Sequence, residues 1–119
     1  MVTRLDSIIG ERTARRHAVA ISRVDPLLRE LRADGIDIVV IGSLARDAFR
    51  SHSDVDLLVR GELTTSRRAI VERAVAAAMR GSGIPYDLIY AADLTPEQLK
   101  EFERDLDPAS GLRKARDQT

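Results

Sequence analysis

The sequence contains no cysteine, and its aromatic residues make up only 3% of the chain. The absence of cysteine excludes disulfides, thiolate-bound zinc, iron–sulfur clusters and thiol nucleophiles. So few aromatic residues cannot build a surface that stacks single-stranded bases. No apolar run is long enough to cross a bilayer, and no apolar stretch precedes a cleavage site near the N-terminus. We therefore expect a cytoplasmic protein with no membrane partner.

An excess of charge of one sign is also missing. The chain has 19 Lys and Arg residues against 19 Asp and Glu residues, which gives a formal net charge of +0. Such a chain has no overall field that attracts nucleic acid, so we expect no nucleic acid as a direct partner. A hydrophobic fraction of 44% and a charged fraction of 32% are typical of a folded domain. The length of 119 residues predicts one domain over 1–119.

Hydrophobic periodicity and turn residues predict alternating helices and strands. Pro26 is expected to kink or divide the predicted helix over 13–33, with Asp25 as a cap. Thr64 or Thr65 is expected to cap the predicted helix over 65–80. That helix is expected to bury the face that carries Ile70, Ala74, Ala77 and Ala78. The predicted elements are a helix over 13–33, a strand over 36–41, a short helix over 44–49, a strand over 54–59, a helix over 65–80, a strand over 86–90 and a helix from Thr95 to about Leu106.

The predicted helix over 65–80 joins the second and third strands as a crossover, which makes those strands parallel. The fold class is therefore α+β (α/β-like), with a small mixed β-sheet and helices mainly on one face. The core of the domain is expected over 36–106, after an N-terminal helical segment over 1–35, and 108–119 is expected to form a flexible tail.

Two acidic residues stand at the start of the second predicted strand. Asp54 and Asp56 are two positions apart, so their side chains point to the same face. An isolated Asp-x-Asp pair is most often a well-solvated strand end. The alternative is a site for a divalent cation, since Mg²⁺ favours one or two carboxylates together with substrate phosphates.

A second signal lies at the end of the first predicted strand. Gly42 and Ser43 break the strand, and the N–H groups that open the following helix are suited to an anion such as a nucleotide phosphate. Arg46 lies one turn further on and can supply positive charge. The simpler alternative is an ordinary strand-to-helix turn in which Ser43 caps the helix.

Topology brings these signals together. If the first two strands are antiparallel, the Gly42–Ser43 turn lies beside Asp54 and Asp56, and Asp87 in the parallel third strand reaches the same edge. Three carboxylates beside an anion site suit phosphoryl or nucleotidyl transfer, in which metal ions neutralise phosphates and a carboxylate accepts a proton.

Gly42-Ser43, ten residues, and then Asp54-Val55-Asp56 resemble the GS-x₁₀-D-x-D signature of the minimal nucleotidyltransferases, a branch of the DNA-polymerase-β-like superfamily. The resemblance implies the polymerase-β-like nucleotidyltransferase fold. It also implies that Gly42 and Ser43 hold the phosphates of ATP, with Arg46 steadying them. Members of the family usually have glycine after that arginine, and this chain has Asp47.

The resemblance further implies a metal site and an enzymatic activity. Asp54 and Asp56 would bind two Mg²⁺ ions, and Asp87 would ligate one of them and help to deprotonate the acceptor hydroxyl. About 30 residues follow Asp87, and we expect these to be too few for a separate acceptor-binding domain.

Small members of this family resemble the antitoxin of HEPN/MNT toxin–antitoxin modules of the type VII kind. The resemblance therefore implies a protein adenylyltransferase that transfers AMP from ATP to a hydroxyl, often of tyrosine, on a helical HEPN-type RNase toxin. Two alternatives stay open: a toxin that transfers nucleotides to RNA or tRNA ends, and a non-catalytic antitoxin that acts by occlusion. Balanced charge argues against the first, and the presence of Ser43 with all three aspartates argues against the second.

Overall fold

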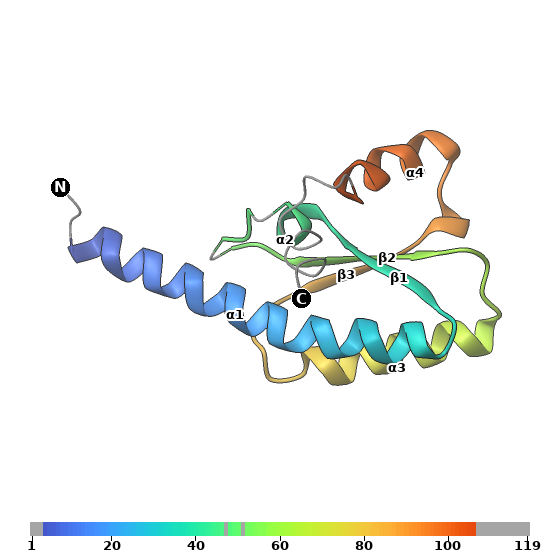
Figure 1. Cartoon of the computed structure of the whole chain (residues 1–119), viewed down its shortest axis with the longest axis horizontal. Helices are drawn as coiled ribbons and strands as arrows, with labels where there is room; N and C mark the ends of the chain where they lie inside the picture. Colours follow the sequence, from blue (N-terminus) through green and yellow to red (C-terminus); the bar gives the residue numbers. More distant parts are fainter. Residues whose placement is uncertain (1–3, 47, 51, 107–119) are drawn as a thin grey trace.

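The elements follow the predicted order of helices and strands (Figure 1). The computed structural model describes residues 4–46, 48–50 and 52–106. The predicted tail over 108–119 lies outside these residues. The elements are α1 (Arg4–Ala33), β1 (Asp37–Ile41), α2 (Gly42–Ala45), β2 (Val55–Arg60), α3 (Thr65–Met79), β3 (Tyr86–Tyr90), a 3₁₀ turn η1 (Ala91–Asp93), α4 (Pro96–Glu103) and a second 3₁₀ turn η2 (Arg104–Leu106).

The sheet has three strands in the order β1-β2-β3. β1 pairs with β2 antiparallel, and β2 pairs with β3 parallel. Both orientations confirm the predicted mixed sheet, and α3 is the crossover that connects the parallel pair (Figure 1). The α+β fold class is therefore confirmed.

Two hydrophobic clusters lie on opposite faces of the sheet. The two long helices, α1 and α3, run side by side and cover one face, while the short α4 lies over the other (Figure 1). On the α4 face, Val39, Ile41 and Leu58 form a small cluster that α4 and the turns beside it cover. Within the described part of the chain, no helix is long and apolar enough to cross a membrane.

The first helix begins earlier than the apolar pattern indicates and is not divided at Pro26, which lies inside it. Asp25 caps no helix end and instead pairs with Arg29, one turn further along the same helix. Packing against the sheet on both sides of the proline outweighs the lost backbone hydrogen bond. The residues buried around Pro26 are Ala20, Val24, Leu27, Leu28 and Leu31.

The buried face of α3 is rotated by one residue from the predicted one. Val71, Val75 and Met79 are buried, whereas Ile70 is 48% exposed. The larger branched and unbranched side chains fill the space above the sheet better than the alanines of the neighbouring stripe. Of the predicted face, Ala74 and Ala78 pack against the core and Ala77 is exposed. Thr64 caps the helix as predicted, by accepting a hydrogen bond from the Arg67 N–H.

Two boundaries near the candidate site also differ from the prediction. α2 begins at Gly42 and ends at Ala45, two residues earlier than the predicted start, and Phe49 is buried outside any helix. Asp54 lies one residue before β2 begins at Val55. At the other end of the sheet, α4 begins at Pro96, directly after the predicted start at Thr95, and a capping box forms between Thr95 and Gln98.

An ion pair ties α3 to the turn after β3. Arg68 makes two hydrogen bonds to Asp93, at 2.9 and 3.0 Å, and its guanidinium lies 4.2 Å from the centre of the Tyr90 ring. The hydrogen bond from Arg68 lowers the pKa of Asp93 below its ordinary value. Burial, followed by the charge of Glu72, raises the pKa of the Tyr90 hydroxyl.

This ion pair predicts an acid-sensitive contribution to stability. Because the pKa of Asp93 is lower in the folded state, the contribution is complete above the unfolded-state value of about 3.9 and is lost as the pH falls through the folded-state value. The stability difference between the wild type and Asp93→Asn should therefore shrink as the pH is lowered. Urea unfolding across this pH range measures it, and a difference that does not change with pH would contradict the assignment.

Candidate active site

The candidate site lies at one end of the sheet, where β1 finishes and β2 and β3 begin. The register pairs Ile41, the last residue of β1, with Asp56 in β2, and it pairs Asp56 with Asp87 in β3. Neighbouring strands are about 4.8 Å apart, so residues in register across a parallel pair carry side chains on the same face at that spacing. The structure therefore brings Asp56 and Asp87 together, as the topology predicts.

The three predicted carboxylates differ in their surroundings. Asp56 is partly buried, whereas Asp87 and Asp54 are exposed. Asp54 lies in the segment that leads into β2, two residues before Asp56. The acidic residues thus extend from a half-buried position in the sheet out to solvent, where a charged substrate can approach them.

Gly42 lies directly against the Asp56 carboxylate. Its φ angle is +73°, in the left-handed region that favours glycine. A Cβ atom added to Gly42 would overlap Asp56 Oδ2 and would lie 3.2 Å from Asp56 Cγ. Glycine is therefore required at position 42 for two reasons: the backbone conformation and the close approach of the turn to the carboxylate. The end of β1 and the acidic residue of β2 form one compact unit.

Ser43 follows in the single turn of α2. The N-cap of α2 is Ile41, with no side-chain hydrogen bond at the cap, so the alternative in which Ser43 caps the helix is wrong. The Ser43 carbonyl accepts a hydrogen bond from the Ala48 N–H at 2.8 Å. Arg46, the predicted phosphate-binding cation, is exposed at the end of the same turn. Asp47, the departure from the family pattern, lies outside the described residues.

The donor set suits a hard divalent cation. Carboxylate oxygens are the ligands that Mg²⁺ prefers, and one or two of them suffice when substrate phosphates complete the coordination. Asp56 and Asp87 meet that requirement by their register. In the part of the chain that the structure describes, no group of three His or acidic side chains is already arranged to hold a metal ion. Coordination by all three aspartates would therefore require side-chain movement at exposed Asp54 or Asp87.

Two arginines of α1 have roles that the sequence pattern did not reveal. Arg16 donates hydrogen bonds to the carbonyl oxygens of Ser53, at 3.0 Å, and Gly83, at 3.4 Å. These residues belong to the segments that lead into β2 and β3, so Arg16 ties together the two strand starts that carry the acidic residues. Arg23 donates to the carbonyls of Ala78 and Arg80 at the end of α3. The seven-residue spacing of the two arginines on one helical face was the available signal.

The three-stranded mixed sheet has acidic residues where β2 and β3 begin, next to the glycine turn at the end of β1. This arrangement is that of a small polymerase-β-like nucleotidyltransferase fold. A family model of the nucleotidyltransferase domain matches residues 21–114, which include the Gly42–Ser43 turn and the three aspartates. The chain belongs to this nucleotidyltransferase-domain family. A comparison with curated proteins finds no match.

Proposed function

We propose that the chain is a Mg²⁺-dependent protein adenylyltransferase that transfers AMP from ATP to a hydroxyl group of a partner protein. The observation that carries the proposal is the contact between the Gly42 turn and the Asp56 carboxylate, with Asp87 in register beside it. Such a turn allows phosphates to approach the backbone while the acidic residues lie next to the reacting phosphorus. The nucleotidyltransferase family supports the same class of reaction.

Each site residue has a defined task in this proposal. The backbone at Gly42 and the hydroxyl of Ser43 bind the β- and γ-phosphates, and Arg46 adds positive charge. Asp54, Asp56 and Asp87 would hold Mg²⁺, which when bound neutralises charge on the phosphates. Asp87, exposed at the start of β3, accepts the proton of the acceptor hydroxyl.

The reaction balances as an in-line displacement. The hydroxyl oxygen of the acceptor forms a bond to the α-phosphorus, the bond from that phosphorus to the β-phosphate oxygen breaks, and pyrophosphate leaves. The site supplies positioning in addition to electrostatic stabilisation, since acceptor and nucleotide must be held in line before the transfer. The exposure of Asp54 and Asp87 leaves room for a macromolecular acceptor.

The acceptor that the resemblance favours is a tyrosine of a helical HEPN-type RNase toxin, which makes this chain the antitoxin. Balanced charge supports a protein acceptor over RNA, because the chain has no overall excess of Lys and Arg. The test uses α-labelled ATP, GTP, CTP or UTP with Mg²⁺, the protein encoded by the neighbouring gene, and total tRNA. We expect label from ATP on the partner protein and no label on tRNA.

Other labelling patterns would replace the proposal. Label on tRNA would identify a nucleotidyltransferase that acts on RNA ends. Neutralisation of the partner with no label on either macromolecule would identify an antitoxin that acts by occlusion.

Ser43→Ala gives a graded test of the phosphate-binding turn. The variant loses one hydroxyl donor while the backbone N–H groups remain, so we expect KM for the nucleotide to rise by about tenfold, the effect of one hydrogen bond to a charged group. Ser66→Ala, an exposed serine in the first turn of α3, is the matched control and should leave KM unchanged. An unchanged KM in Ser43→Ala would show that the hydroxyl does not contact the nucleotide.

A further inference from the structure

The first half of α1 projects beyond the sheet (Figure 1), and the apolar side chains of Leu5, Ile8 and Ile9 in its first turns are exposed. The helix has 30 residues, which corresponds to about 45 Å. Among the α1 side chains that the structure describes, the first buried one is Ala20. Apolar and basic side chains share one face before that point, at three- and four-residue spacings. The residues of this face are Leu5, Ile8, Ile9, Arg12, Arg16 and Val19.

This face is unusually apolar for a solvent-exposed helix. Leu5 is 65% exposed, Ile9 is 48% exposed and Ile8 is 37% exposed. A helix of this length gains most of its stability from packing of its apolar face, and contiguous exposed apolar residues mark interaction sites.

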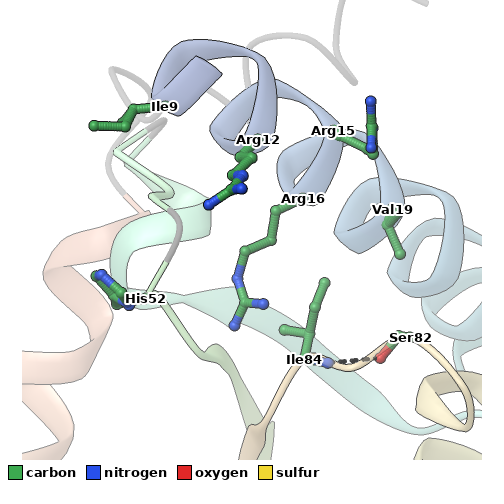
Figure 2. Close-up of a pocket in the computed structure, with 8 residues that line it drawn as sticks. All are labelled: Ile9, Arg12, Arg15, Arg16, Val19, His52, Ser82 and Ile84. Carbon is green, nitrogen blue, oxygen red and sulfur yellow. Dashed lines mark hydrogen bonds between the residues drawn. The ribbon is translucent and has the colours of Figure 1, made fainter. Parts of the chain in front are cut away.

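A groove lies between this face and the segments that lead into the aspartate-bearing strands. We call it the α1 groove; its volume is about 590 Å³. Figure 2 shows Arg12 and Arg16 extending from α1 into the hollow, toward His52 and Ile84, while Arg15 turns away at the rim. His52 is two residues before Asp54, and Ile84 is three before Asp87. A segment docked here would lie next to the candidate active site.

The lining of the groove is basic and apolar together. Among the residues that the structure describes, three arginines and His52 contribute to it, and no acidic side chain does. Arg12 makes no hydrogen bond or ion pair with any residue that the structure describes, and it is not committed to the fold as Arg16 is. Cations covered by a partner require anionic counterparts, because an unpaired buried charge is costly. The complementary occupant therefore carries carboxylates beside apolar side chains.

Two other occupants fit less well. RNA is disfavoured because no Phe, Tyr or Trp side chain of the described residues lines the groove to stack bases, and the chain as a whole is neutral. A second copy of this chain, placed face to face by two-fold symmetry, would bring the same arginines together. An amphipathic helix with acidic and apolar residues would pair its carboxylates with the arginines of the groove and pack its apolar side chains against the exposed Ile9.

We propose that the α1 groove docks an acidic amphipathic segment of the acceptor protein and so presents its hydroxyl to the aspartates. This inference rests on the proposed function, since it concerns the acceptor of that reaction. Arg12 and Ile9 are docking residues with no part in the chemistry.

Binding of two probes tests the proposal. One is the protein encoded by the neighbouring gene; the other is a synthetic amphipathic helix of about 20 residues with glutamates on one face and leucines on the other. We expect Arg12→Glu to weaken binding of both by at least about tenfold, as reversal of one interfacial charge does. Replacing the glutamates of the peptide by glutamine should have a similar effect.

The chain offers two matched controls. Arg73→Glu makes the same charge change at an exposed position of α3 and should alter binding by less than about twofold. Ile9→Ser should weaken binding, whereas Ile70→Ser should not, although both isoleucines are 48% exposed on helices. All four variants change exposed side chains, and circular dichroism verifies that each stays folded.

Several outcomes would overturn the proposal. The first is that neither probe binds the wild-type chain. The second is that Arg12→Glu abolishes binding of a single-stranded RNA while both probes still bind, which would assign the groove to RNA. The third is that Arg12→Glu dissociates a dimer in sedimentation, which would assign it to a second copy.

Failure of the docking proposal can be distinguished from failure of the proposed function. If the partner docks through Arg12 but accepts no AMP, the groove assignment stands and the adenylyltransferase assignment is wrong. If Arg12→Glu transfers AMP to the partner as fast as the wild type does, the adenylyltransferase assignment stands and the groove assignment is wrong.

Discussion

The double variant Asp54→Ala with Asp56→Ala is expected to remain folded and to lose nucleotidyl transfer by at least about a thousandfold, the scale seen when charge stabilisation in an active site is removed. Asp54 precedes β2 and is exposed, and Asp56 is only partly buried at the second position of the strand. Neither side chain belongs to the two hydrophobic clusters. Transfer of label from ATP and urea unfolding measure the two effects separately.

A charge-matched control separates the site from general electrostatics. Asp34→Ala with Glu62→Ala removes the same two negative charges from exposed positions at the opposite end of β1 and β2. This control should transfer AMP at close to the wild-type rate. Substantial activity in the Asp54→Ala, Asp56→Ala protein would show that the acidic strand start is not the catalytic centre. If the double variant transferred no AMP but still neutralised the partner in cells, occlusion would account for the biological function in place of adenylylation.

The strand pairing that builds the site was predictable because it depends on simple rules. A crossover helix between two short strands makes them parallel, and β-branched runs bounded by glycine define where the strands lie. These rules predict that Asp87 reaches the same edge as Asp54 and Asp56, and the structure adds the register that pairs Asp56 with Asp87. The nucleotidyltransferase class was implied by the resemblance of the Gly42-Ser43 and Asp54-Val55-Asp56 motifs to a family signature, and the family match supports that class.

Features that depend on tertiary packing were not predictable in the same way. The unbroken helix through Pro26 exists because the sheet covers apolar residues on both sides of it. The buried face of α3 depends on which side chains fill the space above the sheet, and Val71 is buried there whereas the neighbouring Ile70 is exposed. The structural role of Arg16 depends on the approach of the Ser53 and Gly83 carbonyls, which no local sequence pattern reveals.

Gly42→Ala is expected to damage both the fold and the site. An alanine at φ +73° costs about 1–2 kcal/mol by itself. Its Cβ would also overlap the Asp56 carboxylate, so Asp56 or the turn must shift. We expect a total loss of about 2–4 kcal/mol in the free energy of unfolding, which is in the range of a strained or overpacked position. Transfer activity should fall by at least about a hundredfold, because the displaced carboxylate no longer fits the nucleotide.

Gly81→Ala separates the two causes, because Gly81 has a φ angle of +77° and no atom within 4 Å of an added Cβ. It should show the conformational cost alone and retain activity. Introducing Gly42→Ala into an Asp56→Ala background removes the overlapping carboxylate, so the stability cost of the glycine change should fall toward that of Gly81→Ala. An equal cost of Gly42→Ala in both backgrounds would mean that the turn does not press on Asp56. The close contact at the centre of the site would then be wrong, together with the argument that the turn and the acidic strand form one unit.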